Sequence, residues 1–595
     1  MGLRVHAMTP RARTRGRAAP LSGLVAGALD VAAAPSAALA STGAGGFVLP
    51  PHDAATVLDW LLAGPGLIPA LSWIAVLAWL LAFAAFVVWR RPSGVRRDAW
   101  HDLLVFVAVT SGALAIRLLV PSGPLNFAEA ERVAVAWSRH PQIQPTFESI
   151  PLVMGLARCL GFGADTILHF TGPLVGALGA GFAYLLARSA GLSRAAALLA
   201  GVLVATWPAH VRYSGSAAMS IGAATLWTAA FATALWERLP GSFKVPLLTA
   251  LVVLGVHQRP ECRLLAVAIV PLVFTPGWSW RDRGVFAVAL GAALLPYALA
   301  NSGLDESRGY ASWAPLVFAR WLARDTSISP LWWALAGVLG VVVGRTPWQL
   351  RLTMLLTLAS LALTYAFGAS EQNPFWGQWR YVVTAVPIVS VGAASLADRL
   401  PAFRRRDAVL LGVTAATLLS SLLFVPALVR PIDAQVELAY LRETAPRIAA
   451  TNRYLVLLSA DRQAQIRYES VAVMALGEAL GPVAWPGGAG TPPPFEGHGL
   501  WTQEALLSPR PGGPDLTRTA IFLGMYRPDP EMLRLRERFE LVPLDEREVA
   551  VAPMLQLVNT QCVIPCDTYL GASIPDCNLK LGWYRPVALA RPSPE

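Results

Sequence analysis

Hydrophobic residues along the chain come in repeated long runs, separated by short polar segments. A helix of roughly twenty apolar residues with few charges is long enough to cross the hydrocarbon core of a bilayer. Soluble proteins of this length break their apolar residues into shorter amphipathic runs. The pattern therefore predicts an all-α polytopic membrane protein with about twelve transmembrane helices. These helices are expected near 66–88, 101–120, 167–187, 195–208, 217–236, 245–257, 263–277, 284–302, 329–344, 351–368, 381–398 and 407–427.

Arginine and lysine gather in every second segment between these spans, where the positive-inside rule places cytoplasmic loops. One missed or spurious span would invert the charge bias of every loop after it, so the agreement supports the order of the spans. Arg117 is an exception inside a span, close enough to the outer end to snorkel to the interface. The basic loops hold Arg90, Arg91, Arg96 and Arg97; Arg188 and Arg194; Arg238 and Lys244; Arg281 and Arg283; Arg345 and Arg351; and Arg399 with Arg404, Arg405 and Arg406.

Composition supports a membrane protein and bears on whether a nucleic acid is a partner. Of the 595 residues, 55% are hydrophobic and 14% charged, with a mean hydropathy of +0.50, whereas soluble domains carry about a quarter charged residues. The net charge of +11 and the pI near 9.8 would suit a nucleic-acid partner. Because the basic residues lie in the loops that orient the protein in the membrane, no nucleic-acid partner is predicted.

The two ends of the chain differ from the apolar middle. Residues 1–41 combine a basic region with an apolar run that ends in Ala38-Leu39-Ala40, as in a signal peptide or an uncleaved N-terminal anchor. A disordered basic tail is the alternative. Residues 42–98 hold the first span with its flanks.

Charges return and apolar runs shorten in residues 431–595, which the order of spans places outside the cytoplasm. A helical pattern at 433–450 and buried-strand patterns at 454–459 and 519–525 predict a small extracytoplasmic α/β domain. Residues 487–494 form a loop rich in Gly and Pro. Three cysteines lie near the end of this domain, and either one disulfide in an oxidising compartment or three reduced thiols would fit them. They are Cys562, Cys566 and Cys577.

The segment 121–150 carries the first candidates for chemistry, because it holds carboxylates in an outer loop directly after a span. Transfer of a group from a phosphate-linked sugar needs a general base for the acceptor hydroxyl and cations for the departing phosphate. Glu129 and Glu131 are the candidate bases. They would point to different faces of a helix, so one of them is expected to be structural. Arg132 and His140 lie beside them.

Further outer loops converge on the same side of the membrane, around His210–Tyr213, His257–Glu261, Asp305–Asp325 and Glu371–Arg380. Arg259 and Arg380 suit a phosphate or pyrophosphate, since a guanidinium offers a fixed fork of donors. Snorkelling, or pairing with Glu261 and Glu371, is the alternative. No metal site and no other cofactor is predicted, and a divalent cation at Asp305-Glu306 stays open.

Four motifs resemble those of the GT-C glycosyltransferases, in order and in spacing relative to the spans, over residues 99–430. The chain is most similar to the family of lipid A aminoarabinose transferases and protein O-mannosyltransferases. The motifs are Phe127-Ala128-Glu129-Ala130 with Arg132 and His140-Pro141; Trp207-Pro208 with Arg212-Tyr213-Ser214; Arg259-Pro260-Glu261; and Trp379-Arg380-Tyr381 leading to Pro387.

The resemblance implies a multi-pass protein of the cell inner membrane that transfers a sugar, with inversion, from a polyprenyl-phosphate donor to a lipid, glycan or protein acceptor on the outer face. Arg132, His140, Arg212, Tyr213, Arg259, Arg380 and Tyr381 would then bind substrate.

The first motif departs from the family pattern, because members usually have Asp-Glu where this chain has Ala128-Glu129. A second acid is also missing, since Met219-Ser220 stand where it would be. A catalytically degenerate membrane scaffold that binds a glycan or a lipid is therefore the alternative. A transporter is disfavoured, because charges gather at span ends and no internal repeat is evident.

Overall fold

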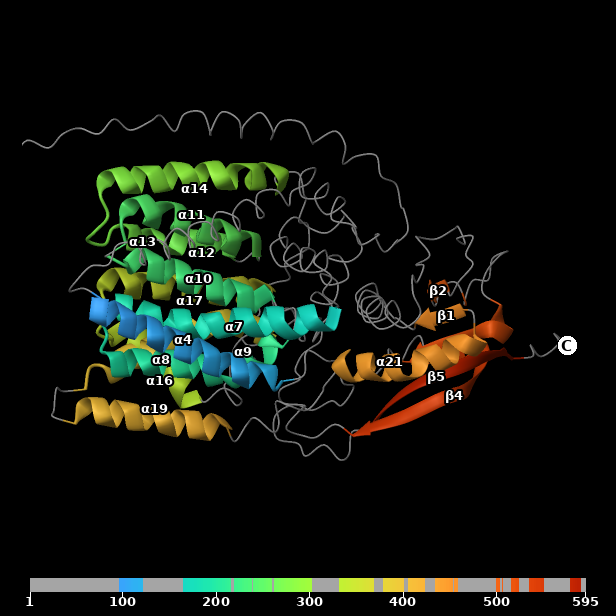
Figure 1. The fold of residues 1–595 in the computed structure, drawn as a ribbon. Coiled ribbons are helices and arrows are strands. Elements are labelled where there is room, and N and C mark those ends of the chain that lie inside the picture. The colour runs from blue at the N-terminus through green and yellow to red at the C-terminus, as the bar shows by residue number, and fades with distance from the viewer. Residues whose placement is uncertain are drawn as a thin grey trace, which may run out of the picture. The chain divides into compact units, whose positions relative to one another are not determined.

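The computed structural model describes a helical part and a sheet with one helix. We describe each part by itself (Figure 1). The residues described are 96–120, 164–215, 219–237, 239–258, 262–301, 331–368, 378–400, 405–422, 434–452, 454–457, 499–502, 506, 515–523, 535–550 and 578–589.

The helical part confirms the positions of the expected helices from residue 101 to residue 422, and their axes lie side by side in Figure 1. The expected span at 66–88 lies outside the described residues. The run at 263–277 forms two short helices. The helices are α4 (Arg96–Leu118), α7 (Ala164–Ser189), α8 (Arg194–Thr206), α9 (Pro208–Ser214), α10 (Met219–Leu235), α11 (Gly241–Gln258), α12 (Cys262–Ala268), α13 (Val270–Val273), α14 (Trp280–Asn301), α16 (Leu331–Val343), α17 (Trp348–Gly368), α18 (Gln378–Ala397) and α19 (Arg406–Leu422).

Two helices of the described part are long and apolar enough to cross a membrane, at Trp100–Leu118 and Phe170–Ser189. A third is added if α8 and α9 form one span bent by 56°. Other apolar helices are shorter, such as Ser220–Leu235 and Val383–Ala397. The described part is thus mostly helical with apolar helices, and the number of about twelve spans stays a prediction.

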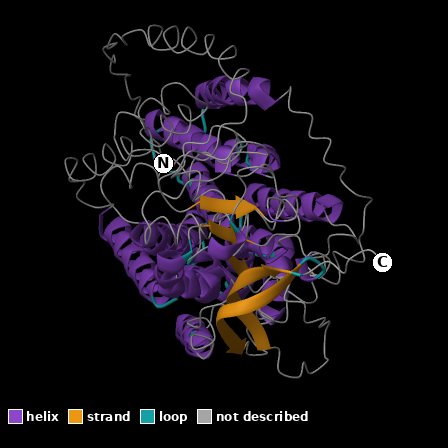
Figure 2. Ribbon diagram, turned by 90° about the vertical axis from the view of Figure 1, so that its right-hand side faces the viewer, coloured by secondary structure: helices purple, strands orange, loops and turns teal. Residues whose placement is uncertain are grey.

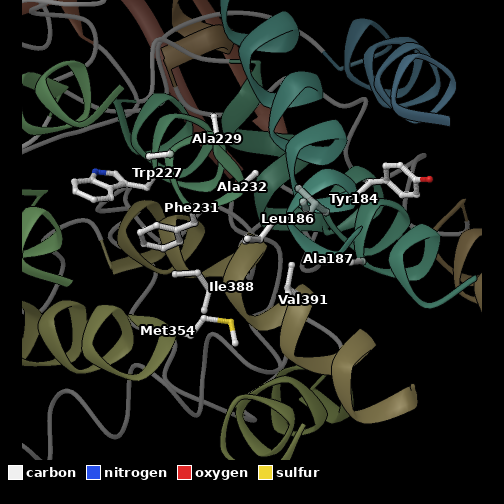
Figure 3. Close-up of a cluster of buried hydrophobic side chains, with 14 of the residues drawn as sticks. Tyr184, Leu186, Ala187, Trp227, Ala229, Phe231, Ala232, Met354, Ile388 and Val391 are labelled. Atoms are coloured by element: carbon white, nitrogen blue, oxygen red, sulfur yellow. The ribbon is translucent and has the colours of Figure 1, made fainter. Parts of the chain in front are cut away.

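Apolar side chains from several helices fill the core of the helical part. In Figure 3, Leu186 of α7 and Phe231 of α10 lie with Ile388 of α18 and Met354 of α17. Small residues allow the closest approaches, as is usual where helices pack without a hydrophobic driving force between them. A Cβ added at Gly340 of α16 would strike the carbonyl oxygen of Gly392 of α18. These two helices therefore pack backbone against backbone.

Two polar clusters join the helix ends that carry the basic loops. In the first, Asp102 of α4 accepts hydrogen bonds from Tyr184 at 2.7 Å and from Arg188 at 3.1 Å, both on α7. Arg194, at the start of α8, lies 3.3 Å from the same carboxylate. These contacts bring the ends of three helices together, as expected if they share one side of the membrane.

The second cluster is centred on Asp398, which follows α18 and is 2% exposed. Its carboxylate accepts hydrogen bonds from Ser193 and Arg406 and forms an ion pair with Arg345. Segments from three widely separated places in the sequence therefore meet at this carboxylate.

The sheet has five strands, in the order β2-β1-β3-β5-β4 (orange in Figure 2). The first three pair in parallel, and β5 pairs antiparallel with β3 and β4. Strands β1 and β3 lie within the predicted ranges 454–459 and 519–525, whose last two residues in each case lie outside the described part. Strands β4 and β5 were not foreseen. The strands are β1 (Tyr454–Leu457), β2 (Gly499–Thr502), β3 (Thr519–Leu523), β4 (Phe539–Ala550) and β5 (Asn578–Ala588), with a short 3-10 helix, η2, at Leu516–Arg518.

Helix α21 (Ala434–Thr451) packs on this sheet through polar and aromatic contacts. Trp583 of β5 donates a hydrogen bond to Thr444 at 2.8 Å, and the ring of Tyr440 stacks on Phe522. At the exposed edge of the contact, Arg547 donates two hydrogen bonds to Glu443, which lowers the pKa of that carboxyl below its ordinary value. The predicted loop at 487–494 and the three cysteines Cys562, Cys566 and Cys577 lie outside the described residues.

Candidate functional site

The break between α8 and α9 is the starting point of the candidate site. Helix α8 ends at Thr206, Trp207 is extended, and Pro208 opens α9 at an angle of 56°. Proline suits the first position of a helix, because it has no N–H to bond and its φ angle is already helical. The break leaves the last carbonyl groups of α8 without helical N–H partners.

Arg117 of α4 supplies the missing donors. Its Nη1 donates to the carbonyl oxygen of Ala205 at 3.1 Å, and its Nη2 donates to that of Val204 at 3.1 Å. A further bond runs from Nη1 to Ala113 within α4 at 3.0 Å. The side chain is fully buried. The expectation that Arg117 snorkels to the interface is therefore wrong, because inward-facing carbonyl groups bind its guanidinium.

The same guanidinium also binds α9. Its Nε donates to Ser214 Oγ at 3.1 Å, and its Nη2 lies 2.8 Å from Nδ1 of His210. Arginine only donates, so Nδ1 must accept and the proton of the neutral ring sits on Nε2. That buried nitrogen has no hydrogen-bond partner among the described residues. Ser214 in turn donates to the carbonyl oxygen of His210 at 2.6 Å.

Helix α9 corrects the expectation that His210–Tyr213 belong to an outer loop. All seven of its residues, Pro208 to Ser214, are buried. Hydropathy favours a loop here because the segment carries His and Arg. The helix is buried nonetheless, because Arg117 donates to Nδ1 of its imidazole and to its hydroxyl group from within.

The charge of Arg117 is met by neutral groups alone in the described part of the chain, where no ion pair of this residue is found. Carbonyl oxygens, one hydroxyl and one imidazole surround it. Burying a charge without a counter-charge is unfavourable, and ionisable groups within membrane spans are typically functional. We call the group formed by Arg117, His210 and Ser214 the arginine cluster.

Two glycines of α7 make room for the arginine cluster. A Cβ at Gly176 would strike Ser214 Oγ and come within 2.9 Å of Arg117 Nε. A Cβ at Gly179 would lie 2.7 Å from Thr225 Oγ1 and 3.7 Å from His210 Nε2. Any larger residue at 176 would thus displace the guanidinium or the hydroxyl.

No family model and no curated protein matches the chain. Among solved structures, it is similar to ArnT from Cupriavidus metallidurans in the apo state, with a TM-score of 0.45, 13% identity and coverage of 82% of this chain and 98% of that one. ArnT bound to undecaprenyl phosphate gives a TM-score of 0.43 with the same identity and coverage.

Arabinofuranosyltransferase AftD from Mycobacteria is a further neighbour, with a TM-score of 0.38 and 18% identity over 60% of this chain. The match spans 29% of the length of that AftD chain.

The described residues contain part of the predicted site. Arg212 and Tyr213 lie on α9 and are 2% and 4% exposed. Arg380 and Tyr381 lie in the first turn of α18, and their side chains are not described. The other predicted site residues fall outside the described ranges: Glu129, Glu131, Arg132, His140 and Arg259. In the described segments, no group of three or more His, Cys, Asp or Glu is placed to hold a metal ion.

From the sequence, Ser214 falls in one of the four motifs and His210 in a converging outer loop, but neither they nor Arg117 were assigned a role in the site. One signal was present, because an arginine inside an apolar run is rare and is usually satisfied by a polar partner. His210 and Ser214 are spaced i, i+4 on a segment that follows a proline, so both can face one side of a helix. That pairing would have pointed to the cluster.

Proposed function

We propose that the chain is an integral membrane glycosyltransferase that moves a sugar from a polyprenyl-phosphate donor to an acceptor on the outer face of the membrane. The observation that carries this proposal is the location of the Arg212-Tyr213 motif. It lies on a helix bound to a buried arginine that has no carboxylate partner in the described part. A positive charge in a low-dielectric site acts over longer distances than one in water. Such a field stabilises a departing phosphate.

The reaction follows from the chemistry of the donor. The acceptor hydroxyl attacks the anomeric carbon and gives its proton to Glu129 or Glu131. The bond between that carbon and the phosphate oxygen breaks, and polyprenyl phosphate leaves with the electron pair. A single displacement inverts the anomeric centre. Arg259 and Arg380 would bind the phosphate, with Arg132, His140, Arg212, Tyr213 and Tyr381 as further substrate contacts.

The test uses purified protein in lipid, offered a panel of polyprenyl-phosphate sugars, with release of polyprenyl phosphate as the readout. We expect Glu129→Gln or Glu131→Gln to lower release by about 10²–10⁴-fold, the usual contribution of a general base. Glu443→Gln is the matched control, since this exposed carboxylate binds Arg547 at the sheet and should not affect release. Equal release from all three variants and the wild type would contradict the assignment of the base.

The second candidate is a catalytically degenerate scaffold, and Ala128 in place of the family's Asp is the feature that favours it. A scaffold would bind the lipid donor without turning it over. Binding of donor with no release of polyprenyl phosphate from any sugar in the panel would establish this alternative.

A further inference from the structure

We infer that Arg117 is a positioning residue of the proposed site, which sets the bend between α8 and α9 and thereby the placement of Arg212 and Tyr213. The inference rests on the proposed function for its catalytic consequence. The claim that the guanidinium holds the bend depends only on the observed hydrogen bonds.

The two arms of the bent span need contacts that hold them in place. Across the break at Trp207 and Pro208 the helical hydrogen bonds are interrupted, and kinks of this kind occur where proline or an inserted side chain replaces them. The guanidinium donates to Val204 and Ala205 on one side of the break, and to Ser214 and His210 on the other. One rigid planar group therefore fixes both arms of the bend.

The geometry of the contacts explains why residue 117 is arginine. The contacts use Nε, Nη1 and Nη2 at once, in directions set by the planar fork. A lysine ammonium has three donors on one atom, so it keeps the charge and cannot reach both arms of the bend. Arg117→Lys therefore removes the planar fork of donors while it keeps the positive charge.

The end of α4 connects the bend to the segment that holds the proposed bases. Beyond Arg117, Val120 packs with Ile116 and with Val211 of α9 in a small buried cluster. The chain then enters the segment 121–150, which holds Glu129 and Glu131. The end of α4 is therefore fixed against the helix that carries Arg212 and Tyr213.

The test compares Arg117→Lys and Arg117→Met with Arg188→Met in the full chain in lipid. Arg188 is a matched control, because it also donates to a backbone carbonyl and joins two helices, with Asp102 as its partner. Amide hydrogen exchange over Trp207–Ser214 should speed up by about tenfold or more in both Arg117 variants and stay unchanged in Arg188→Met. Wild-type protection of α9 in Arg117→Lys would overturn the inference.

Kinetics supply the second readout. In Arg117→Lys the KM for the lipid donor should rise by about tenfold or more while the KM for the acceptor stays constant. A merely structural loss would reduce the amount of active enzyme, so the apparent kcat would fall while both KM values stayed unchanged. That result would also overturn the inference. If the wild type turns over no donor, the proposed function fails, and the exchange result alone decides whether Arg117 holds the bend.

Discussion

Arginines have different kinds of partner at the two ends of the helical part. At the end predicted to face the cytoplasm, Arg188 pairs with Asp102 at 3.1 Å, and Arg406 pairs with Asp398. At the opposite end of α4, Arg117 is fully buried and donates to carbonyl, hydroxyl and imidazole groups. Charge is thus compensated at one end. At the other end, the charge of Arg117 meets only neutral groups among the described residues.

This difference shows which end is suited to anionic chemistry. An arginine paired with a carboxylate has little remaining attraction for a ligand. An arginine solvated by dipoles keeps its full charge, and in a low-dielectric environment that charge attracts an anion at longer range. The departing group of the proposed reaction is a phosphate, so the end of the helical part with Arg117 is the chemically suitable one.

The largest effect is expected from breaking a compensated pair. In Asp398→Ala, Arg406, whose side chain is 13% exposed, loses its nearest carboxylate and keeps the exposed Asp407 at 3.7 Å. Removing one partner of a buried ion pair destabilises by roughly 3–5 kcal/mol. Thermal unfolding in lipid nanodiscs measures the loss. The double variant Asp398→Ala/Arg406→Met should recover part of it, and a double variant as unstable as Asp398→Ala would contradict the pairing.

A smaller effect is expected at the uncompensated end, from the hydrogen bond between Arg117 and His210. His210→Leu removes the acceptor of a charged donor, and we expect a loss of about 1.5–3 kcal/mol in unfolding free energy. His210→Asn places an amide oxygen near the former Nδ1 and should retain most of the stability. Equal losses in the two variants, measured by the same unfolding assay, would show that this hydrogen bond is not what His210 contributes.

The smallest effect is expected from crowding the arginine cluster. Gly176→Ala puts a methyl group against Ser214 Oγ and Arg117 Nε, and overpacking of this kind costs about 1–3 kcal/mol. Gly112→Ala on α4 is the control, because a Cβ there meets nothing within 4 Å. The control should be neutral or more stable, since alanine favours a helix over glycine. Indistinguishable unfolding midpoints for the two variants would contradict the close approach of α7.

Much of the helical part could be predicted from sequence, because long apolar runs and basic loops report on the membrane directly. The expected span at 381–398, for example, falls within three residues of α18 at both ends. The clusters at Asp102 and Asp398 also join helix ends whose basic loops were predicted to lie on the same side of the membrane.

What could not be predicted depends on partners far away in the sequence. Arg117 bonds to residues 87 to 97 positions later, so hydropathy alone placed Arg117 at the interface and His210 in a loop. Strand β4 is rich in charged residues, and its extended form follows from pairing along its whole length with β5. Neither relation is visible in a local window of sequence.

The most direct test of the account asks which side of the membrane each end faces. Single cysteines in an otherwise cysteine-free chain would replace Asp407, which is exposed beside Arg406, and Ser149 in the segment that follows α4. With a membrane-impermeant maleimide applied to intact cells, we expect labelling of Ser149→Cys at once and of Asp407→Cys only after permeabilisation. Labelling of Asp407→Cys in intact cells, with Ser149→Cys protected, would place Arg117 at the cytoplasmic end and contradict the account.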